Sequence, residues 1–496
     1  MTAISSTVFN DIPAALRLPG WYIEFDNRLA GNAVFQGKLL VIGQKLTSGT
    51  HPAGTLVRIT NEGQGDTLFG RGSMLAEMCR AIKHIDLYTE TWAIALEDDE
   101  TAVKAEGAIE ITDGPTETRP LALYMGEHRV WVSMSGGDTP EEVAQSVVDA
   151  INAESRLAVT AAIDGTTASK VVLTCRWGGE TGNDLNLADS VKGESAPGGL
   201  ALTYTAFSGG AVNPELDPVI AGMGSDWWNW VCLPYTDQVS LETIEAEMAE
   251  RYGPMRQIGG RVFAAFRGNH ADTATKGNSR NAPHLTIMGT NLSPTPTWMW
   301  AATNAIVAAK SLAIDPARPL QRLTMPGLIP PPVDIQWIDS ERNLLLFDGI
   351  ATYTVASDGS VQIERQITTY KENSAGVADD SYLDINTPET LERIRFEQIS
   401  MFAQKYPRHK LASDADRDYY DPSQPIMTPK LARSELLSLY RLSFMGENGW
   451  TRDYEGYAER LRANIDPDDP NRLNVIDSPM LIGQYRVHAQ QTQFRR

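Results

Sequence analysis

The sequence contains short patterns that resemble nucleotide and nucleophile sites, but each lacks a residue that the chemistry requires. A phosphate-binding loop needs two glycines separated by four residues, then a Lys and a Ser or Thr. The segment that begins at Gly31 has one residue too many before Gly37, and Leu39 stands where the hydroxyl is needed. A serine nucleophile on a tight turn needs a second glycine, whereas Ser73 and Ser225 have only the preceding one. A loop and two loop or helix-start residues are the simpler interpretations.

Metal-binding patterns are also missing from the sequence. The seven histidines are scattered, so that no paired-histidine motif occurs. Asp414, Asp416 and Asp418 have the spacing of the first ligands of a calcium loop, but Tyr419 replaces the required Gly and Pro425 the required Glu. We therefore expect a solvated acidic turn there, and no catalytic residue, metal or cofactor in the chain.

Cysteines and tryptophans are the remaining side chains with possible chemistry. Cys79, Cys175 and Cys232 are far apart and odd in number, which excludes a disulfide framework and predicts buried, reduced thiols. Five tryptophans gather in two groups: Trp227, Trp228, Trp230, Trp298 and Trp300. They could form a stacking platform for bases or sugars, but a strand packed on an Ala-rich helix explains them more simply.

Bulk composition narrows the class of protein. The 496 residues are too many for one ordinary core and predict two to four domains. A hydrophobic content of 42% is ample for burial, and the net charge of −20 argues against nucleic acid and anionic membranes as partners. We see no secretory signal at the start and no apolar run of membrane-spanning length.

The elements that must position these residues alternate between strands and helices. Residues 1–20 read as an N-terminal arm, and residues 21–96 as strand, helix and strand, with strands at 38–43 and 92–96 around a helix within 70–88. From 211 to 332 the alternation resumes, with strands at 228–233, 261–266 and 284–288 and helices at 240–252 and 297–314. Such alternation predicts one mostly parallel α/β sheet, to which the first segment also contributes.

Residues 97–210 read as an inserted α+β domain. Strands are expected around Ile109, at 129–133, at 157–161 and at 171–175. Between them Thr139, Pro140 and Glu142 predict a capped helix start.

The last part of the chain reads as a C-terminal α+β domain at 333–478 and an arm at 479–496. A hairpin is expected at 350–367, with a type I′ turn at Asp358-Gly359. Two helices follow, which Thr387-Pro388 and Thr428-Pro429 open. In the first, Leu391, Ile394, Ile399, Phe402 and Tyr406 share one face. An Asp/Pro-rich link at 466–470 then leads to a terminal strand.

Several segments resemble, in the same order, those of phage Mu-like contractile tail sheath proteins. They are LPGWYIEFDNRLA (18–30), FGRGSMLAEMCRAI (69–82), GDTPEEVAQSVVDAINAESRLAVTA (137–161), VVLTCRWGGETGNDLNL (171–187), VQIERQITTY (361–370) and SPMLIGQYRVHAQQTQF (478–494). The resemblance covers nearly the whole chain, and its specificity lies in the ordered set rather than in one motif.

The resemblance implies a structural subunit of the virion and not an enzyme. Such subunits stack as hexameric rings around a tail tube, meet baseplate and tail terminator proteins, and assemble in the host cytoplasm. The sleeve contracts and drives the tube through the host envelope. The central α/β domain of this family is described as subtilisin-like in fold, and no catalytic triad is present here to carry over.

The resemblance also implies that both terminal arms donate strands to neighbouring subunits. Residues with the required alternation are Trp21, Ile23 and Phe25 at one end, and Tyr485, Val487 and Ala489 at the other. Alternatively, each arm packs on its own subunit. Candidate electrostatic contacts to an acidic neighbour are Arg486, Arg495 and Arg496.

Three other functions stay open from the residues alone. One is the sheath of a related machine such as a tailocin. The second is an α/β hydrolase-like enzyme with an inserted binding domain, which needs a clustered nucleophile and base. The third is a glycan-binding tail protein, which needs exposed aromatic side chains.

Overall fold

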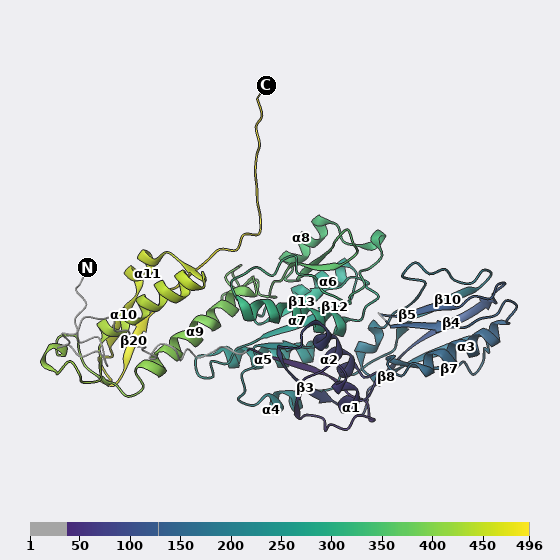
Figure 1. Cartoon of the computed structure of the whole chain (residues 1–496), viewed down its shortest axis with the longest axis horizontal. Coiled ribbons are helices and arrows are strands. Elements are labelled where there is room, and N and C mark those ends of the chain that lie inside the picture. Colours follow the sequence, from purple (N-terminus) through teal and green to yellow (C-terminus); the bar gives the residue numbers. More distant parts are fainter. Residues whose placement is uncertain (1–36, 127, 496) are drawn as a thin grey trace, which may run out of the picture.

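The computed structural model describes residues 37–126 and 128–495. It shows an elongated molecule with three parts in a row, a central sheet with helices, a strand-rich part at one end and a helical part at the other (Figure 1). The expected N-terminal arm and the strand candidates Trp21, Ile23 and Phe25 lie outside the described residues, as does Arg496.

The central part is a six-stranded sheet in the order β13-β12-β11-β1-β3-β2. Its strands are β1 (Lys38–Gln44), β2 (Leu56–Ile59), β3 (Glu90–Leu96), β11 (Trp230–Cys232), β12 (Arg261–Phe266) and β13 (Leu285–Gly289). All neighbours are parallel except β2 and β3. Because β1 pairs with both β3 and β11, the first segment and the later alternating segment form one sheet, as the sequence predicts.

Helices α2 (Met74–Ile85) and α7 (Thr297–Ile314) pack against each other and against β1. Ser73 caps α2, since its hydroxyl accepts a hydrogen bond from the Ala76 N–H. Most of α7 is buried, because its alanines allow close approach on several sides. The remaining helices of this part are α1 (Gln64–Phe69), α4 (Asp217–Met223), α5 (Gln238–Tyr252), α6 (His270–Asn278), η3 (Val333–Ile335) and α8 (Asp339–Phe347).

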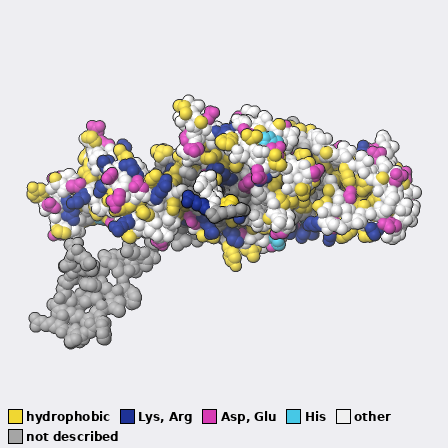
Figure 2. All heavy atoms as spheres, turned by 90° about the horizontal axis from the view of Figure 1, so that it is seen from above, with side chains coloured by type: hydrophobic (Ala, Val, Ile, Leu, Met, Phe, Trp, Pro, Cys, Tyr) yellow, Lys and Arg dark blue, Asp and Glu magenta, His cyan; other side chains and the backbone are white. Residues whose placement is uncertain are grey.

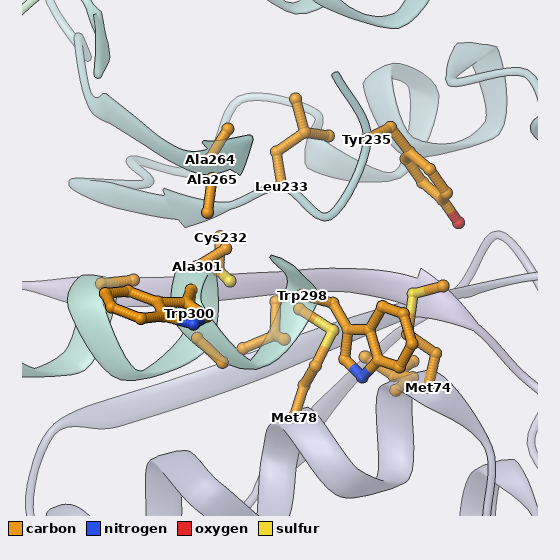
Figure 3. Packing of buried hydrophobic residues seen from close by; sticks show 14 of the residues in the cluster. Met74, Met78, Cys232, Leu233, Tyr235, Ala264, Ala265, Trp298, Trp300 and Ala301 are labelled. Carbon is orange, nitrogen blue, oxygen red and sulfur yellow. The ribbon is translucent and has the colours of Figure 1, made fainter. Parts of the chain in front are cut away.

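The tryptophans belong to the core. Trp228, Trp230, Trp298 and Trp300 are each at most 3% exposed. Figure 3 shows Trp298 and Trp300 beside Met74, Met78 and Cys232, between α7, α2 and the sheet. A stacking platform built on these four side chains is therefore wrong, and only Trp227 is half-buried.

The strand-rich part contains two antiparallel sheets. One has the order β10-β4-β8-β7 and the other β6-β5-β9. Their elements are β4 (Lys104–Asp113), β5 (Leu121–Met125), β6 (His128–Val132), α3 (Pro140–Ala153), β7 (Val159–Ile163), β8 (Lys170–Gly178), η2 (Glu180–Asp184), β9 (Leu187–Asp189) and β10 (Ala201–Ser208). The capping box at the start of α3 is confirmed, with Thr139 and Glu142 each bonding the other's backbone N–H.

The hairpin is formed by β14 (Thr352–Val355) and β15 (Val361–Arg365). The expected type I′ turn is wrong, because it needs positive φ at both central residues and only Gly359, at 84°, has one. Instead, the Gly359 N–H donates to the Ala356 carbonyl and the Ala356 N–H to Ser360, which closes a longer loop.

The helical end has a core of its own, distinct from the continuous core of the other two parts. Its elements are α9 (Asn386–Lys405), β16 (Lys410–Leu411), η4 (Arg417–Tyr419), β17 (Ile426–Met427), α10 (Pro429–Leu439), the π-helix η5 (Tyr440–Glu447), β18 (Thr451–Arg452), α11 (Tyr454–Arg460), β19 (Arg462–Ile465), β20 (Leu473–Ile476) and β21 (Met480–Leu481). Tyr440 and Tyr457 stack at its centre, 3.8 Å apart.

One expectation for this end is wrong, and a second is confirmed only in part. Residues 466–470 are not a link between domains, because β19 and β20 pair across them as a hairpin. The apolar face expected for α9 is only partly buried: Ile394 is 3% exposed, but Ile399 is 46% exposed. The first turns of α9 bury polar residues against the central part instead.

Candidate assembly interface

The C-terminal segment begins as part of its own subunit. β21 pairs antiparallel with β18, with Leu481 opposite Thr451. The Ile482 N–H then donates to the Trp450 carbonyl at 2.9 Å. In the described part of the chain, no backbone–backbone hydrogen bond involves residues 483–495.

Beyond this pairing the segment is extended, and alternate side chains face opposite ways. Gln484 and Arg486 are half-buried against the body, whereas Tyr485 is 74% and Val487 82% exposed. All described residues from 487 onward are exposed, and the chain runs away from the body (Figure 1). In this segment the polar side chains face the body and the apolar ones face solvent, which is the reverse of the usual arrangement in a half-buried strand.

Arg486 was expected to contact a neighbouring subunit, but it forms an ion pair within its own subunit. Its guanidinium is 3.0 Å from Asp384 in the same subunit, and its side chain is only 10% exposed. Burial lowers the pKa of Arg486, opposed by the charge of Asp384. Tyr485, Val487, Ala489 and Arg495 are solvent-exposed, and the amino-terminal candidates lie outside the described residues.

A groove of about 500 Å³ runs beside the anchored part of this segment. It is lined by Leu481, Ile482 and residues 484–487 of this segment, by Asn386, Thr387 and Thr390 at the start of α9, and by Ala317, Arg365, Asp384 and Trp450. The Gln484 side-chain amide donates to the Ala317 carbonyl at 3.4 Å. The groove and the exposed face of the tail are accessible for contact with another chain.

A buried group of charges joins the central sheet to α9, and sequence reasoning missed it. Arg261, the first residue of β12, is fully buried and lies 3.6 Å from Glu389 on α9. Its guanidinium is 2.9 Å from Nδ1 of His284, and both Arg261 and Arg395 lie over the ring of Tyr252. A Glu one turn inside a predicted helix gives no signal in sequence of which strand it meets.

Burial has opposite effects on the acid and the base in this group. It raises the pKa of the Glu389 carboxyl to about 7, although the charge of Arg261 acts in the other direction. It lowers the pKa of His284 to about 2, together with the charges of Arg261 and Arg395. The group is a structural junction rather than an exposed reactive site.

The described residues show where the possible metal ligands and the cysteines lie. No three His, Cys, Asp or Glu side chains there are placed to hold a metal ion. All three cysteines are free and buried, as predicted, and burial raises the pKa of the Cys79 thiol to about 12. None of the described helices is both long and apolar enough to cross a membrane.

Charged side chains are interspersed over the visible face of the molecule in Figure 2. Acidic and basic groups alternate there with apolar ones. On this face the charges of a subunit with a net charge of −20 are not gathered in one field of a single sign.

Comparison with protein families indicates the class of protein to which the chain is similar. The family described as "Phage tail sheath protein central domain" matches residues 209–369, which include β11, β12, β13, α7 and the hairpin. The match thus covers the later half of the central sheet and the strands that follow it.

A closer relative is the Mu-like prophage FluMu tail sheath protein of Haemophilus influenzae. It is 40% identical over 493 residues, which cover 99% of each chain. The chain therefore belongs to the phage tail sheath family, a family of structural proteins and not of enzymes. It is a structural subunit of a contractile phage tail sheath and a component of the virion's oligomeric tail assembly.

Solved structures with a similar course of the chain are more distant. The sheath tail protein of Desulfitobacterium hafniense is 13% identical, with a TM-score of 0.47, and the match covers 93% of this chain and 100% of that one. The helical sheath of the anti-feeding prophage in its contracted state is 11% identical, with a TM-score of 0.47, and the match covers 97% and 99% of the two chains.

Proposed function

We propose that this subunit polymerises as stacked hexameric rings around a tail tube, and that the sleeve contracts to drive the tube through the host envelope. Its partners are further copies of itself, the tube protein, and the baseplate and tail terminator proteins that close the two ends. Assembly takes place in the cytoplasm of the host. Strands 479–496 and 21–25 link neighbouring subunits into a mesh that stays connected while subunits rotate.

The proposed domain division follows from the sequence and has support in the packing. Residues 21–96 and 211–332 form the central, subtilisin-like α/β domain, and 97–210 is an insertion in it. Residues 333–478 form the C-terminal domain, and residues 479–496, which include β21, form the terminal arm. The separate core around Tyr440 supports an independent C-terminal unit from α9 onward, whereas α8 and the hairpin pack into the core of the central part. An insertion placed outward disturbs neighbours least, and the strand-rich part does lie at one end of the molecule (Figure 1).

The observation that carries the proposal is the exposed C-terminal tail. Tyr485, Val487 and Phe494 are 74%, 82% and 85% exposed. An extended segment with large apolar side chains and free backbone groups gains hydrogen bonds and buried area when it extends a neighbour's sheet.

Removal of residues 487–496 tests this role directly. A cut at 479 would also remove β21 and its pairing with β18, whereas a cut at 487 leaves that pairing in place. We expect a folded subunit with an unchanged unfolding midpoint that forms no sleeves in electron micrographs. Normal sleeves from this truncation would refute strand donation by the tail.

The charges at the end of the tail are proposed to meet acidic surfaces of a neighbour. Arg495 is exposed and the subunit carries a net charge of −20. Replacing Arg495 and Arg496 together by Ala is expected to weaken assembly at low salt and to matter less at high salt, because screening already removes the attraction. Assembly that is indifferent to the replacement at low salt would exclude this contact.

A further inference from the structure

Arg486 is the last described residue of the tail that makes a hydrogen bond or ion pair with the body of its own subunit. Residues 480–486 are held by the β18 pairing, by Gln484 and by Arg486, and every described residue after Arg486 is exposed. The segment is therefore held against its own subunit up to Arg486 and is exposed from residue 487 onward.

The partner of Arg486 is itself fixed from another direction. Arg365 at the end of β15 binds Asp384 through two hydrogen bonds, of 3.1 Å and 3.0 Å. Asp384 also bridges to Ile367 and stands two residues before α9. It is 20% exposed, so that water screens it little. The tail thus attaches to a carboxylate that the hairpin has already positioned.

The attachment is polar and specific in geometry. Nη2 of Arg486 lies 3.0 Å from Oδ1 of Asp384 and 3.4 Å from the side-chain oxygen of Asn386. Among the described residues, Nε and Nη1 of Arg486 have no acceptor although they are buried. An arginine held in this way is costly to leave unpaired, and its position along an extended chain fixes the register of the residues around it.

We infer that Arg486 is the residue that sets the register of the donated strand, by its ion pair with Asp384. This inference rests on the proposed strand donation and adds its regulation. Because Arg486 faces inward, Tyr485 and Val487 must face outward, and the residues free to reach a neighbour begin at 487. Without the pair, the segment slides or lifts off, and the apolar residues no longer leave the body at a fixed point.

The position of the tail can be measured in the unassembled subunit. Spin labels are placed at Val487→Cys and at Ala271→Cys, an exposed site on α6, while the three native cysteines are buried and stay unlabelled. Pulsed electron paramagnetic resonance at a concentration below assembly gives the distribution of distances between the labels. We expect one narrow distribution, which Arg486→Gln broadens at least about twofold and Arg495→Gln, a matched charge loss beyond the anchor, leaves unchanged. A narrow distribution in Arg486→Gln would overturn the inference.

Assembly of the otherwise unlabelled variants supplies the second readout. Arg486→Gln is expected to raise the concentration needed for half-maximal sleeve formation by about tenfold, and Arg486→Lys, which keeps the charge, to restore most of it. Normal assembly by Arg486→Gln with a loose tail would overturn the inference. Normal assembly by the subunit cut at 487 would instead refute strand donation itself, so the two failures are distinguishable.

Discussion

At the scale of single residues, the charges between β12 and α9 are the feature that ordinary packing does not explain. Arg261 is fully buried, and Glu389 is 6% exposed. Buried charges are stable only when they are paired and hydrogen-bonded. Removal of one partner leaves the other charge buried and unpaired, so that its desolvation is no longer compensated. Glu389, Glu392 and Arg395 all lie on α9, so this junction couples the helix to the sheet.

Protonation of Glu389 makes the stability of this junction depend on pH. Burial raises the pKa of Glu389 from 4.5 to about 7. The folded subunit therefore holds this proton to a higher pH than the unfolded chain does. The resulting stabilisation is complete below about pH 4.5 and is lost as the pH rises through about 7.

Glu389→Gln is expected to flatten this dependence, because the amide imitates the neutral carboxyl. Wild-type protein should lose up to about 3 kcal/mol of unfolding free energy across the window, and the variant much less. Urea midpoints at a series of pH values check this, with Glu250→Gln on the exposed face of α5 as the control. Equal pH slopes in Glu389→Gln and wild type would contradict the account.

Substitution of Trp300 tests whether the tryptophans stabilise the hydrophobic core. Its side chain is fully buried, its indole N–H donates to Ser293 at 3.0 Å, and its ring contacts Tyr353. Trp300→Ala is expected to cost about 3–5 kcal/mol of unfolding free energy. The control is Trp131→Ala, at a side chain that is 47% exposed, which should lower the unfolding free energy by less than about 1 kcal/mol. Similar urea midpoints for both variants would contradict the core assignment.

At the scale of elements, local signals decide where helices begin, and α3 is the clearest example. Thr139→Ala removes the hydroxyl that accepts the Glu142 N–H. We expect a loss of about 1 kcal/mol of stability. Ser146→Ala within the same helix should change stability little. Hydrogen exchange of the first turn of α3 provides the measurement, and unchanged protection in Thr139→Ala would show that packing alone holds the helix start.

The sequence predicted elements with strong periodicity well. The strand at 38–43 and the helices at 240–252 and 297–314 match β1, α5 and α7 closely. Short elements such as β2, β9 and α4 were missed, because three to seven residues carry too little periodicity. The hairpin across 466–470 was missed because Asp and Pro also mark linkers.

The assembly site was only partly predictable. The alternation at Tyr485 and Val487 is visible in sequence, but which face turns inward depends on Asp384, a hundred residues earlier. The same holds for Arg261 and Glu389, whose contact joins two distant segments. Pairings of this kind depend on tertiary structure, and no local pattern encodes them.

At the scale of the whole molecule, the subunit is an elongated body with an exposed tail. Residues 487–495 of the tail leave the body without backbone–backbone hydrogen bonds, and the surface that Figure 2 shows mixes both signs of charge (Figures 1 and 2). A monomer gains nothing from exposing Tyr485 and Val487, whereas a lattice of identical subunits satisfies each tail on the next copy. The shape is therefore best explained by assembly.

Electron microscopy of the purified subunit at rising concentrations tests this claim most directly. The account predicts long hollow cylinders with a regular helical surface, either from the subunit alone or after addition of the tube protein as a template. Dispersed particles at every concentration, with the tube protein present, would contradict it.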